Sequence, residues 1–445
     1  MRLMIWLREN GKIKSGWFAI AVAVFAAAVL YFGVYCVRLA GTDPHGYKID
    51  YNVFYAAWQS VLNTRGNPYA QQISTATPYL YPPLFAQLFS LLGLLSVRAA
   101  AVVWYLIGVI SLIWSLFLSQ RLVRLGTEKR GIDFAILGFS FVMIARFGLD
   151  NLRMGQINLL VIAIIITGLY LYERNYFWPA ALVLATAISF KLTPALFLIY
   201  FVVKGKWKFA TATGVLTGLL NLLSFLPMGR QAPEVFHYWY SLIILNKQGF
   251  GWGYHGNQSW RALIQRMFTD ENTGSHLQHI NLTINPMAAN IAYYAGVIVI
   301  IGLIAWAIHY RRRKEEQLVS PNSVEYGLVF CGMLMISSLS WKDHYVALIL
   351  PYSVLLDFLV FSKNESSKRI VAGFLAISFL LCTMTNMSFI GGHWAETVET
   401  FSAVFMGVVA LFAGLLYVRT RGMNARTESE IPDQLRHRIE ERVQA

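Results

Sequence analysis

Charged residues are scarce in this chain of 445 residues. Only 13% of them are Asp, Glu, Lys or Arg, whereas 56% are hydrophobic. A soluble domain averages about 25% charged residues, so the sequence has too little polar surface for a soluble protein of this size. Residues 16–37 contain no charged side chain at all, and about 20 apolar residues are enough to cross a bilayer. The sequence predicts a polytopic membrane protein.

Cysteine and several catalytic motifs are also missing or rare. The three cysteines form no CxxC pair, so neither a disulfide framework nor a cysteine-based metal site is indicated. The chain has no GxxxxGK[ST], HExxH or GxSxG sequence, so it lacks the usual marks of a P-loop protein, a zinc protease or a serine hydrolase. A DxD motif that would hold a metal and a nucleotide-sugar is absent as well, which argues against a soluble nucleotide substrate.

The net charge of +14 does not indicate nucleic-acid binding, because the basic residues lie at the ends of apolar runs. This is the pattern of the positive-inside rule. It predicts a plasma-membrane protein with a cytoplasmic N-terminus (residues 1–15), a membrane domain (16–418) and a cytoplasmic tail (419–445). The basic clusters are Arg8, Lys12 and Lys14; Lys204, Lys206 and Lys208; and Arg311, Arg312, Arg313 and Lys314.

The simplest reading has about twelve membrane segments, forming an all-α bundle with two large outer loops, residues 39–81 and 228–287. One segment conflicts with it. If every apolar run crosses, the basic residues of 120–131 fall outside. In the alternative, 82–95 dips into the membrane without crossing, and 177–203 breaks at "SFKLTP" into two half-helices. That version puts Gln156, Asn158 and Lys191 on the same side as Asp50.

The two outer loops are rich in aromatic residues. Such residues lie in belts at the membrane surface or form platforms against sugar rings and lipid, and the sequence permits both. Tyr55 and Tyr81, from the first loop, are included among the expected substrate-binding residues.

Asp50 is the first candidate for catalysis. It follows the first apolar run and is flanked by Ile49, Tyr51 and Phe54, so it should be poorly solvated. Desolvation raises the pKa of a carboxylate and makes it a better base. The alternative is that Asp50 caps the N-terminus of the helix that follows.

Two further polar clusters lie on the same predicted side. In "GYHGNQSWRALIQR" (253–266) a glycine-rich turn should open a helix whose N-terminus attracts phosphate, with Asn257 and Arg261 as candidates. In "SLSWKDHYVALILPY" (338–352), Lys342 and His344 could stabilise a phosphate leaving group. Each cluster could equally be an ordinary turn or a capped surface helix.

Lys191, Gln156 and Asn158 complete the set of candidates. Lys191 lies deep in an apolar run, where an unpaired ammonium group is costly, so we expect an anionic partner. Gln156 and Asn158 belong to the "GQIN" sequence, residues 155–158.

In the order of its motifs the chain resembles glycosyltransferase family 87, integral-membrane enzymes of the GT-C fold. The resemblance covers about residues 16 to 418. The matching stretches are Asp50 to Ala57, "GNPY" (66–69), "YPPLFAQLFSLLGLL" (81–95) with Trp104, "GQINLL" (155–160), "KLTPALFLIY" (191–200), "NQSWRALIQR" (257–266) and "SWKDHYVALILPY" (340–352).

The resemblance implies transfer of a sugar, typically mannose, from a polyprenyl-phosphate carrier to a lipid or glycan acceptor outside the membrane. The family's catalytic carboxylate falls on Asp50 and its histidine after "SW" on His344. Where the family usually has Trp-x-His-His, this chain has Lys342 and Asp343 before a single histidine, which leaves open whether His344 or Lys342 meets the phosphate. The implied mechanism is inverting and needs no metal or other cofactor.

Three other functions use some of the same features. A glycolipid transporter or flippase would share the aromatic, basic outer cavity without needing Asp50 as a base. A ligase acting on lipid-linked glycans and a non-catalytic scaffold are the other two. No internal repeat is evident, which weakens a transporter built from inverted halves.

Overall fold

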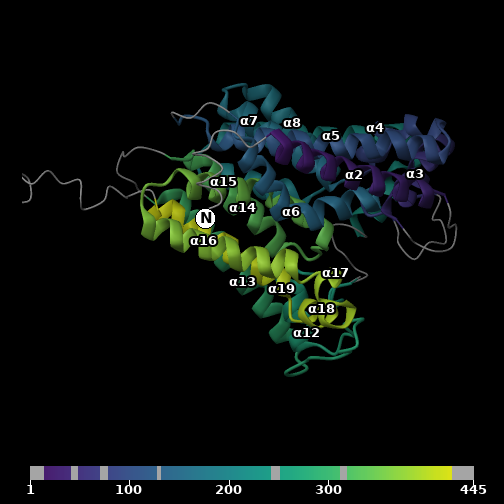
Figure 1. The fold of residues 1–445 in the computed structure, drawn as a ribbon. Coiled ribbons are helices and arrows are strands. Elements are labelled where there is room, and N and C mark those ends of the chain that lie inside the picture. The colour runs from purple at the N-terminus through teal and green to yellow at the C-terminus, as the bar shows by residue number, and fades with distance from the viewer. Residues whose placement is uncertain are drawn as a thin grey trace, which may run out of the picture.

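A computed structural model describes residues 15–41, 49–70, 79–127, 132–241, 251–310 and 318–422. The residues of the two predicted termini lie almost entirely outside these ranges. Tyr47 of the first loop also lies outside them. Within them the chain is helical, and Figure 1 shows the long helices side by side with α3 and α4 at one end of the bundle. The predicted all-α bundle is confirmed.

The helices that form the bundle and its two ends follow in chain order. They are α2 (Ser15–Leu39), α3 (Asp50–Asn63), α4 (Pro83–Phe89), η1 (Ser90–Leu94), α5 (Val97–Val123), α6 (Phe134–Met154), α7 (Asn158–Glu173), α8 (Phe177–Phe190), η2 (Thr193–Ala195), α9 (Leu196–Val203), α10 (Trp207–Phe225), η3 (Leu226–Gln231), α11 (Ala232–Trp239), α12 (Trp260–Phe268), α13 (Pro286–His309), α14 (Pro321–Ile336), η5 (Lys342–Leu348), α15 (Ile349–Phe361), α16 (Glu365–Phe379), η6 (Leu380–Met384), α17 (Met387–Ile390), α18 (Gly392–Thr400), α19 (Ala403–Tyr417) and η7 (Val418–Gly422).

Among the described residues, seven helical stretches are long and apolar enough to cross a membrane. Shorter apolar helices, including α7, α8 and the described part of α2, complete the bundle. Side-chain caps mark where several helices begin, as the sequence requires for the free N–H groups of a first turn. Ser96 accepts a hydrogen bond from Ala99 at the start of α5, and Asp133 accepts two at the start of α6.

One end of the bundle, here called the basic end, brings together the ends of α5, α9, α14 and α19, and three of these carry charged residues there. Val123 at the end of α5 accepts a hydrogen bond from Ser320 beside α14 (2.7 Å). Lys204 after α9 pairs with Glu325 of α14, and Arg419 after α19 pairs with the same glutamate at 3.1 Å. The segment that begins at residue 120 therefore lies at the same end as Lys204, as the positive-inside rule demands.

The apolar run 177–203 is broken where the alternative topology places the break. Helix α8 ends at Phe190 and Lys191 has an extended backbone, with φ −152° and ψ 133°. Glu173, the last residue of α7, and Lys204, just after α9, both contact Asn322 at the basic end. Helix α8 therefore runs away from the basic end, and α9 runs back to it. Lys191 stands at the turn between them.

Aromatic side chains of the first loop form a core of their own. Tyr51, Phe54 and Trp58 are almost fully buried. The rings of Phe54 and Trp58 contact those of Phe85 and Trp104 edge-on, and the ring of Tyr51 contacts that of Trp58. These residues are therefore neither a membrane belt nor a platform for sugars. They pack α3 against α4 and α5, and so fix the helix on which Asp50 stands.

Candidate active site

Asp50 is the first residue of α3, and Ile49 occupies the N-cap position. The amide Nε2 of Gln156 donates a hydrogen bond to Oδ2 of Asp50, and the Tyr81 hydroxyl donates to Oε1 of Gln156 at 3.3 Å. The helix-cap interpretation of Asp50 is therefore wrong. The contact with Gln156 also excludes the topology in which 82–95 crosses, because that version puts the two residues on opposite sides of the membrane.

A glycine lets Gln156 reach Asp50. Gly155 ends α6 in the left-handed region, with φ 64° and ψ 37°, a conformation that favours glycine. A Cβ atom there would lie 2.7 Å from Cβ of Tyr51. Trp104 donates a hydrogen bond to the Gly155 carbonyl at 2.7 Å. The "GQIN" turn is thus packed directly against the first turn of α3.

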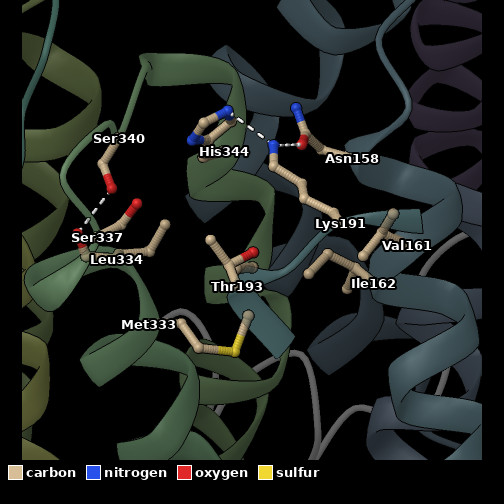
Figure 2. A pocket seen from close by; sticks show the side chains of 11 residues that line it. Asn158, Val161, Ile162, Lys191, Thr193, Met333, Leu334, Ser337, Ser340 and His344 are labelled. Atoms are coloured by element: carbon tan, nitrogen blue, oxygen red, sulfur yellow. Dashed lines mark hydrogen bonds between the residues drawn. The ribbon is translucent and has the colours of Figure 1, made fainter. Parts of the chain in front are cut away.

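Lys191 lies between two neutral partners. Its Nζ donates to Oδ1 of Asn158 at 2.6 Å and lies 2.8 Å from Nε2 of His344 (Figure 2). An ammonium group has no acceptor, so while Lys191 is protonated Nε2 of His344 can only accept. The same Nζ lies 5.8 Å from the ring centroid of Tyr81, which connects Lys191 with the Asp50 side of the site.

Asp343 is the residue of this site that was absent from the predicted set. Its Oδ2 accepts a hydrogen bond from Nδ2 of Asn158 at 2.7 Å and lies 3.9 Å from Nε2 of His344. The available signal was its position between Lys342 and His344 in "SWKDH". We refer below to the polar cluster, which consists of Asp50, Tyr81, Gln156, Asn158, Lys191, Asp343 and His344.

The environment of Asp50 disfavours its charged form. Burial raises the pKa of Asp50 well above its usual range, and the neighbouring carboxylate of Asp343 raises it further, followed by Asp150. Gln156 and the Lys191 ammonium act in the opposite direction and are outweighed. An ionised Asp50 is therefore a stronger base than an aspartate in water.

A small cavity opens beside Lys191, with Lys191, Asn158 and His344 at one end and a mixture of apolar and hydroxyl side chains elsewhere. Figure 2 shows Lys191, Asn158 and His344 together, with Val161, Ile162 and Met333 farther along. Thr193, Leu334, Ser337, Ser340 and Ala347 complete the lining. With a volume of about 30 Å³ the cavity has room for one or two water molecules beside Lys191. Within the described ranges, no three His, Cys, Asp or Glu side chains are grouped so as to hold a metal ion.

Lys342 lies apart from the polar cluster. Its Nζ contacts both carboxylate oxygens of Glu399, at 2.9 and 3.1 Å. Arg146 pairs with the same carboxylate at 2.7 Å, and Nδ1 of His255 lies 3.4 Å away. Burial raises the pKa of Glu399, but His255, Lys342 and Arg146 outweigh it and hold the pKa at about 2. This ion network ties η5, and with it Asp343 and His344, to α18.

Asn257 and Tyr55 also have structural partners. Asn257 is fully buried, donates to the carbonyl of Ser338 at 3.0 Å and accepts from the amide of Ser340 at 3.0 Å. The Tyr55 hydroxyl donates to the carbonyl of Leu95 at 2.8 Å. The predicted helix after "GNQS" is present as α12, with Ser259 as its cap.

Glu399→Gln is expected to destabilise the protein. The change leaves Arg146, Lys342 and His255 around a neutral amide, and breaking a buried ion pair costs about 3–5 kcal/mol. Because the folded-state pKa lies below the unfolded value of about 4.3, this stabilisation is present at neutral pH. It is lost as the pH falls through about 4 toward about 2.

Thermal unfolding in detergent, measured at pH 7 and again near pH 3, checks this expectation. The difference in Tm between wild type and variant should be large at pH 7 and smaller at pH 3. Glu365→Gln, on an exposed i,i+3 pair with Lys368, is the control and should have little effect. An equal difference at both pH values would contradict the ionised state assigned to Glu399.

Taken together, a buried carboxylate of raised pKa and a nearby lysine in a membrane bundle are the groups that a group-transfer enzyme uses as a base and as a cation for a leaving group. Residues 79–338 match the family model described as glycosyltransferase family 87. The chain belongs to this family and is a glycosyltransferase, as its motif order indicated.

Curated proteins similar to this chain include two from mycobacteria. One is the polyprenol-phosphate-mannose-dependent alpha-(1-2)-phosphatidylinositol mannoside mannosyltransferase of Mycobacterium tuberculosis, 27% identical over 69% of this chain and 70% of that protein. Another is the corresponding phosphatidylinositol pentamannoside mannosyltransferase of Mycolicibacterium smegmatis, 25% identical over 68% of this chain and 67% of that protein. A solved structure, ArnT from Cupriavidus metallidurans bound to undecaprenyl phosphate, aligns with 92% of this chain and 78% of its own, with a TM-score of 0.42 and 14% identity.

Proposed function

We propose that the protein transfers mannose from a polyprenyl phosphate to a hydroxyl group of a glycolipid, on the outer side of the membrane. The observation that carries this proposal is the polar cluster. In it Asp50, a carboxylate of raised pKa, is linked through Gln156 and Tyr81 to Lys191, which lines a small cavity. The names of the mycobacterial relatives support the sugar, the carrier and the kind of acceptor.

In the proposed reaction Asp50 takes the proton of the acceptor hydroxyl. The acceptor oxygen attacks the anomeric carbon from the face opposite the phosphate, and the carbon–oxygen bond to the phosphate breaks. The polyprenyl phosphate leaves with the bonding electron pair as an anion. Stabilising that anion lowers the barrier more than protonating it would.

Lys191 is the residue that we assign to the leaving phosphate. Its hydrogen-bond partners, Asn158 and His344, are uncharged while His344 accepts from it. Within the described residues the ammonium group therefore has no salt-bridge partner that an arriving anion would have to displace. His344 accepts a hydrogen bond from the ammonium group and so holds it in position. Lys342, which is already paired with Glu399, is not assigned this role.

The outer location rests on the placement of charge. The basic end of the bundle carries Lys204 and Arg419, and the polar cluster lies away from that end. With the basic end in the cytoplasm, the cluster faces the outside. Both termini are then cytoplasmic.

A reconstituted assay tests the proposal. Purified protein in detergent is given polyprenyl-phosphate mannose with phosphatidylinositol mannosides, and both the mannosylated product and free polyprenyl phosphate are measured. We expect the two to form in equal amounts. Intact donor with every glycolipid acceptor tried would contradict the proposal, and movement of intact glycolipid across vesicles without any cleavage would favour a flippase.

The pH dependence of transfer should reveal the raised pKa of Asp50. As a base Asp50 must be ionised, so kcat/KM should fall on the acid side with an apparent pKa above the value of about 4 that is usual for aspartate. Asp343→Asn removes the neighbouring charge that contributes most to the shift after burial. The acid limb of that variant should therefore move to lower pH. A limb that stays in place or moves upward would show that Asp50 does not titrate in this way.

A further inference from the structure

Arg261 of α12 is a buried cation that the polar cluster does not use. Its side chain is only 9% exposed. The guanidinium lies between two rings, 3.7 Å from the centroid of Trp252 and 4.7 Å from that of Tyr293. In the part of the chain that the structure describes, no carboxylate pairs with it. The guanidinium donates a hydrogen bond to the Tyr293 hydroxyl, and its buried Nε has no hydrogen-bond acceptor. A desolvated guanidinium in this state favours an anion.

The surroundings of Arg261 add to this attraction. It is the second residue of α12, whose free N–H groups and positive dipole end favour negative charge. The helix is also fixed beside the cavity. The amide of Gln258 donates to the carbonyl of Ser340 at 2.9 Å, and Ser340 lines the cavity next to Lys191.

Arg261 also lies next to the membrane. Tyr293, one of its two rings, belongs to α13, a long apolar helix that is mostly exposed in the bundle. Ile291, Tyr294 and Ile298 of this helix are exposed by 64%, 59% and 70%. A surface of this kind faces lipid. An anion at Arg261 would therefore sit where the head group of a membrane lipid lies.

We propose that Arg261 binds the phosphate of a phosphodiester-bearing glycolipid acceptor, separately from the donor phosphate at Lys191. The inference rests on the proposed function and adds to it the residue that anchors the acceptor. Trp252 and Tyr293 hold the guanidinium in place, and the acceptor's sugar extends from this anchor toward Asp50.

Kinetics with two acceptors test the inference. One is a mannolipid with a phosphodiester, and the other is an uncharged alkyl mannoside. For Arg261→Met we expect the KM of the phosphodiester acceptor to rise about 10- to 100-fold, the effect of losing a hydrogen bond to a charged group. The kcat, the KM of the donor and all kinetics with the alkyl mannoside should stay near wild type. Arg261→Lys, which keeps the charge, should restore much of the affinity.

Arg230→Met is the matched control, because Arg230 is exposed in η3, and it should change none of these constants. Three results would overturn the inference. They are a raised KM of the donor with both acceptors, an equal rise in the KM of the two acceptors, and no change in the KM of either acceptor. Binding of the two lipids without donor, measured on the same variants, tests the anchor even if the protein transfers no sugar.

Discussion

Asp50→Asn should abolish sugar transfer and at the same time make the protein more stable. A positioned general base contributes about 10²- to 10⁴-fold to a rate, and asparagine cannot take the proton. The stability gain follows from the raised pKa of Asp50. Ionising this group costs more in the folded than in the unfolded state, so the cost is fully present at pH values above the folded-state pKa. Asparagine removes it.

The sign of the pH effect makes this prediction specific. As the pH falls toward about 4, the usual pKa of aspartate, both states of the wild type become protonated. The Tm of the variant should therefore exceed that of the wild type by less at acid pH than at neutral pH. Asp270→Asn, on a mostly exposed carboxylate beside His279, should change neither transfer nor stability. A variant at Asp50 that loses activity and stability together would point to a structural carboxylate.

Lys191→Met should have the second largest effect. Methionine keeps much of the length of lysine but removes the charge that we assign to the leaving phosphate. Losing one such stabilising group costs about 10²- to 10³-fold in kcat. Inhibition by free polyprenyl phosphate should weaken as well, because the product carries the same phosphate.

Steady-state kinetics with polyprenyl-phosphate mannose, together with product inhibition, measure this effect. Lys208→Met is the control, because Lys208 is exposed at the start of α10, and it should behave as wild type. If Lys191→Met kept the wild-type inhibition by polyprenyl phosphate, the phosphate would have to bind elsewhere. Lys342 or Arg261 would then be the next residue to change.

The sequence predicted the members of the site better than their arrangement. Asp50, Gln156, Asn158, Lys191 and His344 were all identified as costly or conspicuous polar residues beside apolar runs. The sequence did not determine whether these residues lie on the same side of the membrane, because that depends on whether residues 82–95 cross it. Hydropathy alone does not decide this for so short a run. The contact between Gln156 and Asp50 decides it.

Pairings between distant charges could not be predicted in the same way. Lys342 and His344 are two residues apart, yet one pairs with Glu399 and the other with Lys191. The η5 helix points the two side chains in different directions, and Glu399 comes from α18, much later in the chain. The same holds for the aromatic residues of the first loop, whose burial depends on α4 and α5.

The anomeric configuration of the product tests the central claim most directly. Donor with a β-linked mannose, labelled with ¹³C at the anomeric carbon, is converted by the purified enzyme and the product is examined by NMR. A single displacement with Asp50 as base gives an α-linked mannose. A β-linked product would mean two displacements, and with them a carboxylate acting as nucleophile, which contradicts the mechanism proposed for Asp50.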